Sequence, residues 1–141
     1  MKSVYYVGLS NNFHKEIFFM VDLIKTPDEK IIEQYSYGQC MYLATALHRK
    51  YNFEIQCIME SDDVGEYLHH AWVVDTDGMM IDIVGKFPSN KNDFVNDLSK
   101  VIGKLNESDL LAIIRKYSDI KDDAWNICIK EAEDLISEYF A

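Results

Sequence analysis

The sequence predicts an α+β fold in which a small antiparallel sheet lies between helical segments of the chain. Residues 53–85 alternate apolar and polar side chains and contain turn residues, which is typical of strands. The segments before and after them carry apolar side chains at helical spacing. The chain has 141 residues, 48% of them hydrophobic, which is enough for the core of one domain. We therefore expect a single domain over residues 1–141.

The N-terminal quarter is expected to hold one strand and two helices. Residues 4–8 have the composition of a short strand. A helix is predicted over residues 12–25 because apolar side chains recur at helical spacing, at Phe13, Ile17, Phe18, Val21 and Ile24. A second helix has Thr26 as its N-cap and Pro27 at its first position, and it ends near Tyr35.

A third helix is predicted from Cys40 to about Tyr51, immediately before the sheet. Three strands follow, and the last two are connected by a turn at Thr76-Asp77-Gly78; they span residues 53–60, 68–75 and 79–85. These strands and the helix that precedes them are the expected functional core, at residues 34–85.

No strand is predicted in the C-terminal part of the chain. Its pattern indicates three helices, at residues 91–103, 107–117 and 121–139. Asn106 or Ser108 is a suitable N-cap for the second of them. Residues 90–141 are therefore expected to form a helical cover on the core.

The net charge of −10 is concentrated in the middle of the chain, where residues 52–90 carry 1 basic and 8 acidic side chains. Such a surface repels phosphate backbones, so we expect no nucleic-acid partner. The acidic middle suits a basic protein or peptide, although ordinary solubilising charge explains it equally well.

Cysteine content and hydropathy indicate a cytoplasmic protein. Three cysteines at unrelated spacings do not form a disulfide framework and are typical of a reducing compartment. No apolar run reaches the ~18 residues of a membrane span, and the N-terminus lacks a signal-peptide pattern. We expect no membrane association.

Cys40 is the candidate nucleophile because of its place in the chain. Gly38 ends the preceding helix, so the thiol lies at the first turn of the next one, where the free N–H groups stabilise a thiolate. A small buried side chain at a helix start is the alternative interpretation. Cys57 and Cys128 lie on apolar faces and are predicted to be buried and unpaired.

A thiolate nucleophile needs a base and a group that orients the base. Gly78 at the third place of a three-residue loop favours a hairpin register in which Trp72 faces Asp82. His70 and Asp82 are then diagonal neighbours on one face, within reach of a hydrogen bond. His69 is the rival base, but alternation places it on the other face, with the core residues Ala71, Val73, Ile81 and Ile83.

The Cys40 backbone N–H and the side-chain amide of Gln34 are the predicted donors to an oxyanion. A solvated residue on the preceding helix is the alternative for Gln34. Cys40 with His70 could bind zinc in principle, but the paired ligand spacing of structural zinc sites is missing. We expect neither a metal nor another cofactor.

The pattern Gly38-x-Cys40-x-x-x-Ala44-x-x-Leu47, followed by "HAWV" at residues 70–73 and then by Asp82, resembles the core of the papain-like and transglutaminase-like cysteine enzymes. The spacing from Gln34 to Cys40 is similar to that of the papain oxyanion-hole glutamine and nucleophile. The chain departs from papain in lacking an aromatic residue after the cysteine and in its short interval from cysteine to histidine. The resemblance therefore implies a minimal transglutaminase-like core, small stand-alone versions of which occur among bacterial and phage proteins, including effectors.

This resemblance implies attack of Cys40 on an amide or thioester carbonyl to give an acyl-enzyme. The expected activity is that of a peptidase, a deamidase or an acyltransferase, with His70 as base and then acid and Asp82 as the orienting group. The alternative is a non-catalytic acidic module that binds or inhibits a basic partner.

Overall fold

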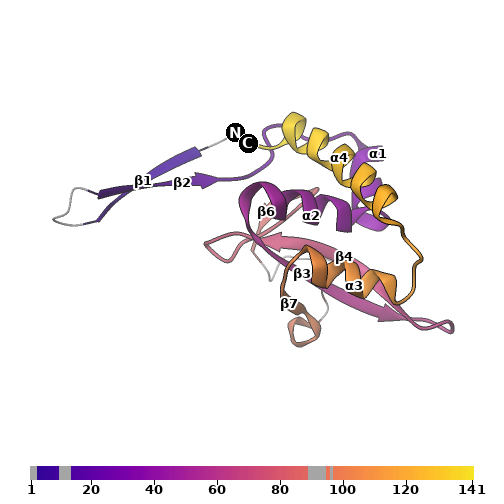
Figure 1. Ribbon diagram of the computed structural model, residues 1–141. Helices are drawn as coiled ribbons and strands as arrows, with labels where there is room; N and C mark the ends of the chain where they lie inside the picture. The colour runs from indigo at the N-terminus through magenta and orange to yellow at the C-terminus, as the bar shows by residue number, and fades with distance from the viewer. Residues whose placement is uncertain (1–2, 10–13, 89–94, 96) are drawn as a thin grey trace.

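A five-stranded antiparallel sheet in the order β6–β5–β4–β3–β7 forms the centre of the fold (Figure 1). The computed structural model describes residues 3–9, 14–88, 95 and 97–141 of the chain. The fold class is α+β, as predicted. The strands of this sheet are β3 (Glu54–Ser61), β4 (Glu66–Val74), β5 (Met80–Asp82), β6 (Gly85–Phe87) and β7 (Ile102–Leu105).

The second helix, α2 (Cys40–Tyr51), lies between the sheet and the long C-terminal helix. It packs on β4 on one side and against α4 (Asp122–Tyr139) on the other (Figure 1). This position explains why its residues 43–47 are all buried. Two shorter helices, α1 (Glu29–Tyr37) and α3 (Glu107–Arg115), complete the fold. Among the described residues, no helix has the length and apolar character needed to cross a membrane.

The N-terminal segment differs from the prediction of helices at both ends of the chain. The strand predicted at residues 4–8 is present as β1 (Ser3–Leu9), but the helix predicted at 12–25 is wrong. Residues 12 and 13 lie outside the described part of the chain; strand β2 (His14–Met20) occupies most of the rest and pairs with β1 as a separate two-stranded sheet. The Ile-Phe-Phe sequence of β2 favours a strand once a partner strand is available. Pairing with β1 then determines the structure, although the apolar residues also have helical spacing.

The next helix begins later than predicted. Asp28, and not Thr26, is the N-cap of α1, because its carboxylate accepts a hydrogen bond from the Ile31 N–H at 3.1 Å. The predicted helix from Cys40 to Tyr51 is confirmed.

The C-terminal segment is only partly the helical cover that was predicted. Of the helix predicted at 91–103, residues 91–94 and 96 lie outside the described part of the chain. The rest forms a short 3₁₀ turn at Leu98–Lys100 and the edge strand β7, so the prediction of no strand in this segment is wrong. The two later helices are confirmed, and α3 has a complete capping box between Asn106 and Asp109.

The predicted turn between β4 and β5 is confirmed. Val73 pairs with Ile81, which is the register expected from a three-residue loop. Gly78 has φ of 80°, in the left-handed region that this loop requires. The Asp75 carboxylate accepts the N–H groups of Asp77 and Met79 and thereby closes the loop.

Candidate active site

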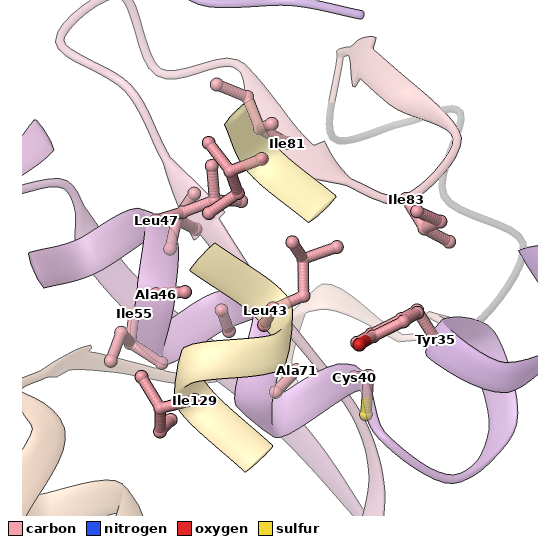
Figure 2. Packing of buried hydrophobic residues seen from close by; sticks show 14 of the residues in the cluster. Tyr35, Cys40, Leu43, Ala46, Leu47, Ile55, Ala71, Ile81, Ile83 and Ile129 are labelled. Atoms are coloured by element: carbon pink, nitrogen blue, oxygen red, sulfur yellow. The ribbon is translucent and has the colours of Figure 1, made fainter. Parts of the chain in front are cut away.

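Cys40 is the first residue of α2, and local hydrogen bonds explain why the helix starts there. The backbone N–H groups of Gly38 and Gln39 both donate to the Gln34 carbonyl, at 3.2 and 2.9 Å, which ends α1 and turns the chain. Figure 2 shows the thiol at this end of α2, in the buried cluster that also contains Tyr35 and Ala71. The side chain is only 4% exposed. A thiol in this position lies in the field of the first-turn N–H groups, which have no partners within the helix.

His70 and Asp82 form a buried pair, as the hairpin register predicts. Nε2 of His70 lies 2.9 Å from Oδ2 of Asp82, and the two side chains are 0% and 4% exposed. The other carboxylate oxygen of Asp82 accepts the Val84 N–H at 2.9 Å. The Asp82 carboxylate is therefore fixed by two hydrogen bonds, one to the turn that follows it and one to His70.

A β-bulge in β4 determines which of the two histidines enters the site. Ile58 pairs with His70 and Met59 with Leu68, so His69 is the extra residue. The predicted position of His69 among core residues is therefore wrong. It is 29% exposed and lies 3.4 Å from the Glu60 carboxylate. A bulge bends its strand and redirects the neighbouring side chains, which leaves His70 as the buried histidine.

Cys40 is near enough to His70 for its charge to act on the imidazole, and we name these three side chains the Cys40–His70–Asp82 cluster. Burial lowers the pKa of His70, but hydrogen bonds to Asp82 and Cys40, with the charges of both, raise it to about 9. The imidazolium is therefore the favoured form at neutral pH. Because Nε2 is bonded to Asp82, Nδ1 is the nitrogen that can exchange a proton with the thiol.

Trp72 covers the ring of His70. The two rings stack with their centroids 5.9 Å apart and their planes 27° from parallel. The indole is fully buried, and its Nε1 donates to Oε1 of Gln56 at 3.1 Å. This stacking excludes water from the histidine and fixes its ring. Sequence reasoning missed this role, although strand alternation already placed Trp72 on the same face as His70.

Gln34 does not share the burial of the cluster. Its side chain is exposed, and its Nε2 donates to Oε1 of Gln39 at 2.9 Å. The two glutamines border an open hollow of about 440 Å³ on the outer side of α1. The assignment of Gln34 as an oxyanion donor stays a prediction.

The three cysteines are free, but only one has the environment of a nucleophile. Cys57 is fully buried, as predicted, and burial, with a smaller effect of nearby Cys40, raises its pKa to about 12. The prediction that Cys128 is buried is wrong, because its side chain is half-buried, next to Tyr42. In the part of the chain that the structure describes, no group of three or more His, Cys, Asp or Glu residues could hold a metal ion.

Comparison with known proteins gives no independent assignment. The chain matches no family model, and neither the curated proteins nor the solved structures gave a significant match. The functional argument therefore depends on the geometry of the cluster.

Proposed function

We propose that the protein is a cysteine-dependent hydrolase or acyltransferase that forms an acyl-enzyme on Cys40. The observation that carries this proposal is the buried hydrogen bond between His70 and Asp82, with the Cys40 thiol in reach of the same imidazole. An imidazole between a carboxylate and a thiol is the arrangement that nucleophilic acyl transfer requires. A papain-like or transglutaminase-like core, as the sequence resemblance implies, accommodates this chemistry.

In the proposed reaction the Cys40 sulfur attacks an amide or thioester carbonyl while His70 holds the proton. The tetrahedral intermediate collapses to the acyl-enzyme when His70 gives that proton to the leaving group. Water or an amine then attacks the acyl-enzyme, and His70 accepts the proton of the incoming group. Asp82 keeps the imidazole in orientation throughout and does not react. No bound metal or cofactor takes part.

The substrate we propose is a protein or peptide, with a preference for basic sequences. The end of β3, the start of β4 and the connection between them carry exposed acidic side chains, at Glu60, Asp62, Asp63 and Glu66. Their charge would attract a basic peptide and repel nucleic acid. A reducing, cytoplasmic compartment would keep Cys40 as a free thiol.

Alkylation of the native protein by iodoacetamide tests the proposal. We expect Cys40 to be labelled faster than Cys57 and Cys128, and still to react at pH 6, where a free cysteine is almost entirely the thiol. His70→Ala should suppress this labelling. Peptide mapping by mass spectrometry identifies the labelled cysteine. A Cys40 that reacts only at alkaline pH, to the same extent in His70→Ala, would contradict the proposed enzyme.

Burial of the cluster favours a second candidate, a non-catalytic acidic module that binds or inhibits a basic partner. Cys40 is 4% exposed and His70 fully buried, so a purely structural cluster would show the same contacts. In that case Cys40→Ala lowers the free energy of unfolding, and the native thiol stays inert. The alkylation experiment separates the two candidates, because only an enzyme requires a reactive thiolate.

A further inference from the structure

The two tryptophans of the chain have the same kind of hydrogen bond but different neighbours. Both indoles are buried. Nε1 of Trp72 donates to Oε1 of Gln56 at 3.1 Å. Nε1 of Trp125, on α4, donates to Oε2 of Glu107 at the same distance. Trp72 also stacks on the imidazole of His70, so its hydrogen bond is connected to the proposed reaction.

Gln56 fixes the orientation of the Trp72 indole from the neighbouring strand. The two residues are direct partners in the pairing of β3 with β4. Because an indole N–H can only donate, the amide oxygen of Gln56 must face it, and the amide NH₂ is left for another acceptor. That acceptor is Oε2 of Glu54, at 2.9 Å, so the amide is held on both sides. In this orientation the indole face lies on the ring of His70, with the centroids 5.9 Å apart.

The stacked indole favours the protonated form of His70. An aromatic face attracts a cation that lies within about 6 Å of its centroid, and the attraction is stronger where water is excluded. The titratable groups that act on this imidazole are Asp82 of β5 and Cys40 of α2, and Trp72 adds to their effect without adding a charge. Loss of the Gln56 acceptor would leave a buried indole N–H without a partner, which is costly, so the ring would turn toward another acceptor. The hydrogen bond to Gln56 therefore keeps the indole face on the imidazole.

We propose that Gln56 is a positioning residue that holds the Trp72 indole on His70 and so stabilises the imidazolium. The imidazolium in turn favours the thiolate of Cys40, which is the nucleophile of the proposed reaction. This inference rests on the proposed function. Gln56 acts through the indole and takes no part in the bond changes, so its removal should alter the ionisation of the site and not its reacting groups.

The pH dependence of Cys40 alkylation tests this role in the whole chain. Gln56→Met removes the acceptor at nearly constant side-chain volume. We expect the pH at which iodoacetamide labels Cys40 at half its maximal rate to rise by roughly one pH unit, a tenfold change in the ionisation constant. Trp72→Phe retains an aromatic ring but has no N–H, so adding Gln56→Met to it should cause no further shift. Gln56→Leu, also without an acceptor, replaces Gln56→Met if that variant does not fold.

Trp125→Phe is the matched control and also provides a spectroscopic signal. It removes a buried indole hydrogen bond of the same length, on α4, and should leave the pH profile unchanged. Trp72 is then the only tryptophan of the sequence. Its fluorescence should fall when His70 is protonated, because an imidazolium quenches an indole stacked on it. This pH-dependent change should largely disappear when Gln56→Met is added, since the indole then leaves the imidazole.

The outcomes separate failure of this inference from failure of the proposed function. An unchanged pH profile in folded Gln56→Met, or an equal shift in Trp125→Phe, overturns the positioning role, while labelling that depends on His70 upholds the enzyme. A further shift in the double variant also overturns it, because Gln56 would then act by another route. A wild-type Cys40 whose labelling does not depend on His70 overturns both proposals. Thermal unfolding of each variant verifies that it is folded.

Discussion

The hairpin of β4 and β5 has a buried carboxylate at each end, Asp75 paired with Lys86 of β6 and Asp82 paired with His70, and the two pairs differ in what they can do. At the turn end, Lys86 Nζ lies 2.6 Å from Asp75 Oδ2, and the side chains are 7% and 6% exposed. At the other end, Nε2 of His70 lies 2.9 Å from Oδ2 of Asp82, and these two side chains are buried as well. Both carboxylates also accept backbone N–H groups of the turns that follow them. In geometry and burial the two ends are alike.

The cation makes the difference. An alkyl ammonium stays charged near neutral pH, whereas an imidazole exchanges its proton in that range when its partners change. His70 also has the Cys40 thiol as a neighbour, while Lys86, on β6, pairs with the turn carboxylate of Asp75. A buried carboxylate is therefore weak evidence of function by itself. A titratable partner with a nucleophile beside it is the stronger sign.

The largest expected difference between the two ends is in acyl transfer. His70→Ala and Cys40→Ala should each reduce acylation by p-nitrophenyl acetate by at least about 10³-fold, since each removes a reacting group. Lys86→Met should retain the rate in the folded protein, because the turn-end pair does not contact the thiol. Release of p-nitrophenolate under single-turnover conditions measures both. An equal loss in Lys86→Met would mean that the cluster has only a structural role.

For the free energy of unfolding, we expect the turn-end pair of Lys86 and Asp75 to have the larger effect. Lys86→Met leaves the Asp75 carboxylate buried without its cation and should lower the free energy of unfolding by about 3–5 kcal/mol. The double variant Asp75→Asn with Lys86→Met should recover much of this loss, because no charge remains buried and the amide oxygen still accepts the turn N–H groups. Urea denaturation at pH 7 measures both variants. A cost of about 1 kcal/mol or less, as for an exposed pair, would contradict burial of this ion pair.

The pair of His70 and Asp82, at the other end of the hairpin, should make the free energy of unfolding depend on pH. The pKa of His70 rises from 6.5 to about 9 in the folded protein, so folding favours the protonated form. The resulting stabilisation is complete below pH 6.5 and is lost as the pH rises through about 9. The change is on the order of 3 kcal/mol. Urea denaturation between pH 6 and pH 9.5 should show this decline in the wild type and a much smaller one in His70→Gln; parallel curves would contradict it.

The hairpin was predictable because its determinants are local. Gly78 specifies the loop, the loop specifies the register, and the register brings His70 to Asp82. The bulge at His69 depends on the register of the neighbouring strand β3, which no local pattern encodes.

The N-terminal and C-terminal segments show the same distinction between local and non-local determinants of structure. Strand β2 replaces a predicted helix because β1 is present to pair with it, and β7 forms because the edge of β3 is available. In both segments a partner distant in sequence determines the structure, and local periodicity does not contain that information.

The smallest expected effect compares the two carboxylates directly. Asp82 uses both oxygens, one for His70 and one for the Val84 N–H, whereas an asparagine has a single acceptor oxygen. In Asp82→Asn one of these hydrogen bonds must be lost, but the imidazole can still be oriented part of the time. Acylation by p-nitrophenyl acetate should therefore fall roughly 10–100-fold, less than in His70→Ala, because the group orients the base without reacting.

Asp75→Asn is the matched control for this substitution, since it makes the same chemical change at the other end of the hairpin. It should lower stability, because Lys86 loses its counter-ion, but leave the acylation rate of the folded protein nearly unchanged. Rates are compared at a temperature where circular dichroism shows both variants folded. Equal rates in Asp82→Asn and wild type would show that Asp82 only builds its turn, and the two ends of the hairpin would then be equivalent.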